Sequence, residues 1–80
     1  MMNMNVKVYS TKFCPYCKLA KNFLEEKKIP FEEIDVQENQ EAAKEMIEKS
    51  GQMGVPVIEI DGKIVIGFNV EQIKTLLKIE

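Results

Sequence analysis

Two cysteines, Cys14 and Cys17, are the only thiols in this chain of 80 residues, and Pro15 and Tyr16 lie between them. At this spacing on a helix two thiols lie about one turn apart, so they can close a small, reversible disulfide. Such a bridge encloses almost no loop and therefore removes little entropy from the unfolded chain. The pair is a poor structural staple, and its spacing predicts redox chemistry.

Metal binding is the alternative that a Cys-x-x-Cys pair leaves open. A closed tetrahedral zinc site needs four ligands, usually Cys or His. The chain has two Cys and no His, so one copy cannot complete such a site. A dimer that shares four thiolates can, and we keep that possibility beside the redox interpretation.

Composition excludes several other kinds of chemistry. Without His, the chain lacks the usual general base near neutral pH and the commonest metal ligand. Its 11 basic residues are all Lys, which removes the bidentate fork by which Arg grips phosphates and carboxylates. A net charge of −2 and a pI of about 5.2 argue against a nucleic-acid partner.

Length and hydropathy predict one domain over residues 1–80 in the cytoplasm. A chain of 80 residues leaves no room for a second domain. The longest aliphatic or aromatic runs are three or four residues, against the ~20 that a membrane span needs. Residues 1–5 contain no cationic stretch followed by an apolar one, so no signal peptide and no membrane partner are expected. We expect a monomer in a compartment that keeps thiols reduced.

The cysteine pair is predicted to lie where a strand gives way to a helix. Val6-Lys7-Val8-Tyr9 alternates apolar and polar residues, as a strand does, and a helical pattern runs from Cys14 to about Lys28. Pro15 suits the first helical position, where a missing N–H costs nothing. Cys14 then lies at the positive end of the helix dipole, which lowers the pKa of its thiol below the free value of ~8.5. Lys12 is expected to add cationic stabilisation.

The rest of the chain predicts an α/β fold with the element order βαβαββα. The further elements are a strand over 31–36, a helix capped by Asn39 and running to about Ser50, strands over 57–60 and 63–66 joined by Asp61-Gly62, and a helix over 69–78. Two crossovers and a hairpin imply one mixed four-stranded sheet flanked by helices. The expected buried residues of the three helices are Leu19, Ala20, Phe23 and Leu24; Ala42, Ala43, Met46 and Ile47; and Val70, Ile73, Leu76 and Leu77. Lys18, Lys21 and the other charged helix residues are expected to be solvated.

From about residue 6 to residue 77 the chain resembles the glutaredoxins of the thioredoxin-fold group. The resemblance is carried by Cys14-Pro15-Tyr16-Cys17, by Val55-Pro56 before the third strand, and by Gly67 before the last helix. It implies a thioredoxin-like fold and thiol–disulfide exchange, with Cys14 attacking and Cys17 resolving. It further implies a cis Pro56 that faces the cysteines and a Val55 backbone that pairs with an extended substrate. With Lys12 and Tyr16, these two residues form the expected substrate-binding set.

The chain departs from the glutathione-binding members of that family at two places. Gly54 stands where they usually carry Thr, and Phe68 replaces the second glycine of a Gly-Gly pair that is normally followed closely by Asp. We expect Phe68 to crowd a ligand lying against the backbone, and the carboxylate for the ligand ammonium is missing. The chain looks more like the glutaredoxin-like redoxins that a flavoprotein thioredoxin reductase recharges.

These features predict a carrier of electrons with no bound cofactor. Its partners are expected to be disulfide-containing proteins and an external reductant, either thioredoxin reductase with NADPH or glutathione. Whether it is a general reductant or a dedicated donor is left open. The competing hypothesis is a metal or iron–sulfur cluster carrier in which two copies share a cluster through Cys14.

Overall fold

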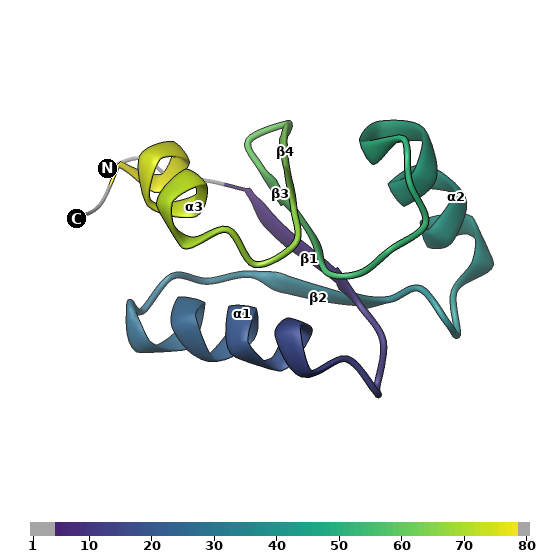
Figure 1. Cartoon of the computed structure of the whole chain (residues 1–80), viewed down its shortest axis with the longest axis horizontal. Coiled ribbons are helices and arrows are strands. Elements are labelled where there is room, and N and C mark those ends of the chain that lie inside the picture. Colours follow the sequence, from purple (N-terminus) through teal and green to yellow (C-terminus); the bar gives the residue numbers. More distant parts are fainter. Residues whose placement is uncertain (1–4, 79–80) are drawn as a thin grey trace.

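The computed structural model describes residues 5–78 and confirms the predicted order of elements (Figure 1). The elements are β1 (Val6–Ser10), α1 (Pro15–Glu26), β2 (Glu32–Asp35), α2 (Gln40–Ser50), β3 (Val57–Ile60), β4 (Lys63–Ile66) and α3 (Val70–Leu77). β2 is shorter at both ends than the predicted strand over 31–36. α1 begins at Pro15, so Cys14 precedes the helix rather than opening it.

The strands form one mixed four-stranded sheet, as predicted, and their order in it is β2-β1-β3-β4. β1 runs parallel to β2 and antiparallel to β3, and β3 runs antiparallel to β4. The last two strands are joined by Asp61 and Gly62, whose φ angles of 50° and 85° are the pair of positive values that a tight two-residue hairpin requires. Of the two predicted crossovers only β1-α1-β2 joins parallel strands, because α2 leads from β2 to a strand that runs antiparallel to it.

Helices cover both faces of the sheet, because successive strand residues point to opposite sides. On one face α1 and α3 pack against the larger core, which comprises Val6, Val8, Ala20, Leu24, Ile58, Ile60, Val65, Ile73 and Leu77. On the other face α2 packs against a smaller core of Tyr9, Ala42, Met46 and Val57. Figure 1 shows α2 apart from the pair formed by α1 and α3.

Two of the predicted helix faces are displaced from the observed ones. In α1 the buried residues are Cys17, Ala20 and Leu24, and Leu19 is 47% exposed. In α2 Ile47 is 37% exposed, beside the buried Ala42 and Met46. The buried stripe of α1 is thus turned toward the cysteines, and Cys17 is one of its members.

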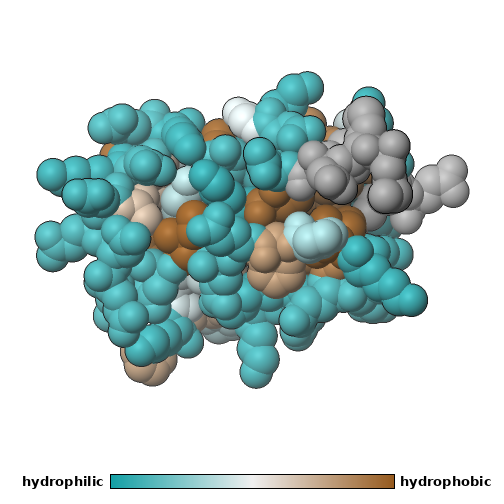
Figure 2. Space-filling model, turned by 180° about the vertical axis from the view of Figure 1, so that it is seen from behind, coloured by the Kyte–Doolittle hydropathy of each residue, from teal (hydrophilic) through white to brown (hydrophobic). Residues whose placement is uncertain are grey.

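Among residues 5–78, buried charge is confined to the α2 face. Glu59 of β3 is almost fully buried and accepts a hydrogen bond of 2.7 Å from the Lys49 ammonium. That bond raises the pKa of Lys49 above its ordinary value of 10.5. The space-filling view from behind shows a mostly hydrophilic surface with small hydrophobic areas near its middle (Figure 2). Within residues 5–78 no helix has the length and apolar character needed to cross a bilayer.

Candidate active site

Cys14 is the N-cap residue of α1. Its backbone is extended, with φ −113° and ψ 106°, and its Sγ accepts a hydrogen bond of 3.1 Å from the backbone N–H of Cys17. Pro15 occupies the first helical position, as predicted. The sulfur therefore takes the place that a hydroxyl or carboxylate oxygen usually fills at a helix start, where unpaired amides and the helix dipole favour negative charge.

The two cysteines form a disulfide, with their Cα atoms 5.2 Å apart. Their surroundings differ: Cys17 is 1% exposed, whereas Cys14 is half-buried. An incoming thiolate can therefore approach the Cys14 side chain directly, whereas the surrounding residues shield Cys17. The geometry suits an attacking thiol at Cys14 and a shielded, resolving thiol at Cys17.

Two aromatic residues beside the pair are open to solvent. Phe13 is 85% exposed and Tyr16 is 64% exposed. Phe13 therefore does not pack under the cysteine loop. Exposed aromatic rings flanking a reactive thiol are suited to contact a partner, because they bury large areas at low entropic cost.

Lys12 lies two residues before Cys14, and its ammonium is held by a carboxylate. The Nζ of Lys12 donates to Oε1 of Glu38 over 3.0 Å, and both side chains are exposed. The hydrogen bond and the charge of Glu38 raise the pKa of Lys12 above its usual 10.5. The predicted cationic support for the Cys14 thiolate is therefore offset by Glu38, while the predicted role of Lys12 in substrate binding stays a prediction.

An open groove of about 700 Å³ lies beside Cys14, and the sequence did not predict it. The groove is lined by the loop of residues 11–14, by Pro15, Lys18 and Lys21 of α1, and by Glu33 of β2. Lys21 is not simply solvated as expected, because its Nζ donates to Oε2 of Glu33 over 2.6 Å. The i, i+3 spacing of Lys18 and Lys21 indicates in the sequence that both lie on one face of the helix. The position of Glu33, in contrast, depends on the pairing of β2 with β1.

The bond between Val55 and Pro56 is cis, as the family resemblance implied. Pro56 is buried and Val55 is half-buried. The Pro56 carbonyl accepts a hydrogen bond of 2.9 Å from the N–H of Gly67, whose φ is 78°. This bond ties the segment before β3 to the segment before α3. The pairing of Val55 with a substrate stays a prediction.

Phe68 contributes a ring to the larger core. It is half-buried, packs against the larger core, and meets the ring of Phe23 edge to face with centroids 6.0 Å apart. These contacts do not test the expectation that Phe68 crowds a ligand, which stays a prediction. The Asp of the family pattern is absent, because residues 67–71 read Gly-Phe-Asn-Val-Glu, and the carboxylate in the first turn of α3 is the exposed Glu71. The side chain of Asn69 caps α3 by accepting the N–H of Gln72 over 3.1 Å.

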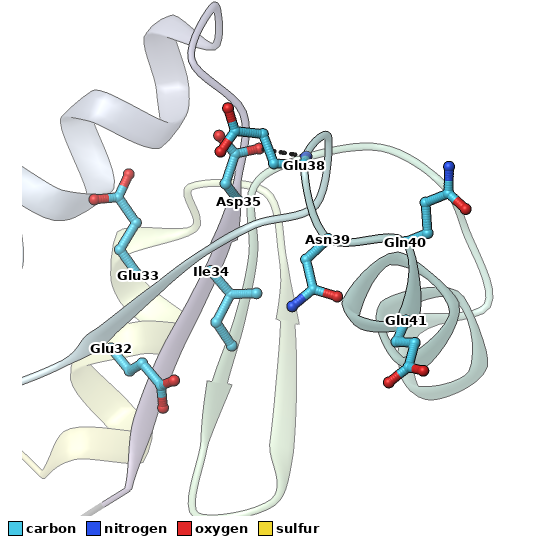
Figure 3. Close-up of a pocket in the computed structure, with 8 residues that line it drawn as sticks. All are labelled: Glu32, Glu33, Ile34, Asp35, Glu38, Asn39, Gln40 and Glu41. Atoms are coloured by element: carbon cyan, nitrogen blue, oxygen red, sulfur yellow. Dashed lines mark hydrogen bonds between the residues drawn. The ribbon is translucent and has the colours of Figure 1, made fainter.

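A second hollow, of about 620 Å³, is lined mainly by acidic residues of β2 and the start of α2 (Figure 3). Its carboxylates point in different directions, and Asp35 uses an oxygen to accept the backbone N–H groups of Gln37 and Glu38 over 2.8 and 3.2 Å. Within residues 5–78 no group of three or more Cys, Asp or Glu side chains is arranged to hold a metal ion. The acidic residues of this hollow therefore do not converge on a cation.

Comparison with known proteins agrees with the fold and the cysteine pair. A family model for glutaredoxin matches residues 6–65. An uncharacterised glutaredoxin-like 8.6 kDa protein from the rubredoxin operon of Clostridium pasteurianum is 44% identical over 91% of this chain and 97% of its own. The crystal structure of a mutant thioredoxin-like protein superposes with a TM-score of 0.89 at 32% identity, over 100% of both chains.

A third match is to another solved structure. NrdH-redoxin from Escherichia coli is a glutaredoxin-like protein described as having a thioredoxin-like activity profile. It is 26% identical, with a TM-score of 0.81 over 90% of this chain and 93% of its own.

Proposed function

The chain belongs to the glutaredoxin family, and on that premise we propose that it is a dithiol electron carrier that reduces the disulfides of proteins or small molecules. The observation that supports this most directly is the hydrogen bond from the Cys17 N–H to the Cys14 sulfur at the N-terminus of α1. In the reduced protein the same amide and the helix dipole stabilise a thiolate at Cys14. The thiolate is the form that attacks a disulfide.

The reaction takes two exchange steps. The Cys14 thiolate attacks one sulfur of the substrate disulfide, which breaks that bond, forms a mixed disulfide and releases the other sulfur as a thiolate that takes up a proton. Cys17 then loses its proton and attacks the Cys14 sulfur, which closes the Cys14–Cys17 bond and releases the second substrate thiol. Two electrons pass from the cysteine pair to the substrate. The observed disulfide is the product form of the protein.

We further propose that a flavoprotein thioredoxin reductase with NADPH returns those electrons, in preference to glutathione. The support is the absence of an Asp close behind Gly67 and the use of the Asn69 side chain to cap α3. Without the Asp that the family pattern places near the ammonium group, we expect glutathione to react mainly as a generic small thiol. The likeness to a glutaredoxin-like protein with a thioredoxin-like activity profile points the same way.

Two recharging systems distinguish the proposals. The oxidised protein is reduced by glutathione with glutathione reductase, and separately by NADPH with thioredoxin reductase from the same source. We expect efficient reduction by the flavoenzyme and slow, non-saturating reduction by glutathione. Saturable glutathione kinetics of equal efficiency would overturn the choice of reductant. Failure to reduce any disulfide after chemical reduction, together with iron in the purified protein, would favour the cluster carrier instead.

A further inference from the structure

Three lysines border the groove beside Cys14, and they are not equivalent. Lys12 is paired with Glu38 at 3.0 Å and Lys21 with Glu33 at 2.6 Å. Lys18 is exposed and has no carboxylate within ion-pair distance among residues 5–78. The groove therefore presents one uncompensated positive charge, on the same helix as the Cys14–Cys17 pair.

Glu33 keeps the second lysine out of that role. Its Oε2 accepts hydrogen bonds from Lys21 and from the hydroxyl of the buried Ser10, over 2.6 and 3.2 Å. These two contacts fix the Glu33 carboxylate at the wall of the groove and neutralise the Lys21 ammonium. An anion that enters the groove is left with Lys18 as its cation.

We propose that this groove binds an extended partner segment that carries a carboxylate two residues from its disulfide-bonded cysteine, with Lys18 as the residue that recognises the carboxylate. The inference rests on the proposed function and adds the chemistry of the substrate. Lys18 follows Cys14 by four residues, so the Cα atoms of the two residues lie about 6 Å apart along the helix axis. An extended chain rises about 3.3 Å per residue, so two residues of it span the same distance.

The exposed ring of Phe13 completes the recognition surface. It lines the groove and immediately precedes Cys14. A ring at this position removes water from a bound segment, and lower local polarity strengthens the pairing of a carboxylate with Lys18. Glu38, which pairs with Lys12, disfavours a second carboxylate at that end of the groove, so the preference is for one acidic residue at a defined spacing and not for a generally acidic partner.

The test uses symmetric peptide disulfides, each made of two copies of one neutral peptide joined through a single cysteine. Glu, Gln or Lys is placed two residues from the cysteine, on either side, and a further peptide carries Glu four residues away. The protein is reduced, freed of reductant and mixed with each peptide, and the rate constant of a single turnover is measured. Comparing peptides within one variant divides out any change in the reactivity of Cys14 itself.

We expect the Glu peptide at the two-residue spacing to react about threefold faster than the Gln peptide and about tenfold faster than the Lys peptide at low salt. The preference should shrink at high ionic strength and at the four-residue spacing. Lys18→Gln should remove most of it and Lys18→Glu should reverse it. Lys44→Gln is the matched control, because it removes an exposed lysine of α2 and should keep the preference.

A wild-type protein that does not discriminate among the peptides, or a preference that survives Lys18→Glu, overturns the inference. Turnover of a small uncharged disulfide by the same preparation distinguishes failure of the groove assignment from failure of the proposed function. If that substrate is reduced while the peptides are not distinguished, only the groove assignment fails. If it is not reduced, the proposed function itself fails.

Discussion

At the start of α1 the Cys14 sulfur accepts the N–H of Cys17 over 3.1 Å, and at the start of α2 the Asn39 side-chain oxygen accepts the N–H of Ala42 over 3.0 Å. The two capping residues have nearly the same backbone, with φ −113° and −114°. One cap is a thiol and the other an amide. The comparison implies that the proposed reactive centre is an ordinary helix cap whose capping atom is a sulfur, which is suited to act as a nucleophile.

The same hydrogen bond has different consequences at the two sites. At Asn39 the capping group is neutral, so the interaction stabilises the helix and nothing else. At Cys14 the acceptor can ionise, so the amide and the helix dipole favour the thiolate over the thiol. The third helix repeats the amide version at Asn69. Two of the three helix starts are therefore internal controls for the one that carries the cysteine.

Replacing the capping cysteine is expected to give the largest effect. Cys14→Ser keeps a good capping group, so α1 should fold, but disulfide reduction should fall to the uncatalysed rate because the nucleophile is gone. Coupled disulfide reduction and circular dichroism measure the two properties. Asn39→Ser is the matched variant and should reduce disulfides at the wild-type rate. Residual turnover by Cys14→Ser would move the attacking thiol to Cys17.

Removing the buried cysteine should leave half of the reaction. Cys17→Ser retains the thiolate that attacks and lacks the thiol that resolves, so it should accumulate a mixed disulfide with its substrate. Mass spectrometry should show one adduct per chain, located on Cys14, after mixing the reduced variant with a peptide disulfide. An adduct that forms and is released at the wild-type rate would show that an internal resolving thiol is not needed.

The reduced protein should also show the inequality of its thiols directly. Cys14 combines access with amide and dipole stabilisation, whereas Cys17 is 1% exposed. Alkylation at pH 6 should therefore modify Cys14 at least about tenfold faster, with an apparent pKa below the free value of ~8.5. Peptide mapping after a short exposure to iodoacetamide reads the ratio. Faster labelling of Cys17 would reverse the assignment.

The starts of the helices could be predicted from the sequence, because a capping residue acts only on the adjacent turn. Asn39 before an apolar helical pattern predicted the start of α2, and the structure confirms it. Pro15 likewise marked the first position of α1. These residues act through their own backbone and the next turn, so no knowledge of distant contacts was needed.

The parts that the sequence missed depend on contacts across the fold. Leu19 has the composition of a core residue, but the rotation of α1 on the sheet buries Cys17 in its place, at the spacing shared with Ala20 and Leu24. Cys17 therefore belongs to the buried face of α1 as well as to the reactive pair, and its type alone did not indicate this. The partners of Lys12 and Lys21 lie more than ten residues away, and only the register of β1 with β2 brings them near.

The amide cap should matter for stability and not for turnover. Asn39→Ala leaves the N–H of Ala42 without its acceptor, and such losses cost about 0.5–2 kcal/mol of folding free energy. Urea unfolding of the oxidised protein measures the change, and the rate of disulfide reduction should not move. Asn69→Ala should behave in the same way. A fall in turnover that is larger than the unfolded fraction would show that the caps of α2 or α3 act on the reaction.

The smallest expected effect concerns the ion pair that joins the two helix starts, since Lys12 precedes Cys14 and Glu38 precedes Asn39. The raised pKa of Lys12 keeps its ammonium charged until the pH passes 10.5, so its charge is constant while the Cys14 thiol titrates. Glu38→Gln removes an anion and releases the Lys12 cation, which should lower the pKa of that thiol by about 0.3 pH unit. Lys12→Gln removes the cation and leaves the anion, which should raise the pKa of the Cys14 thiol by a similar amount.

Thiolate absorbance at 240 nm against pH measures both shifts, and both should shrink at high salt. Shifts of the same sign in the two variants would mean that the pair acts on Cys14 through loop geometry and not through charge.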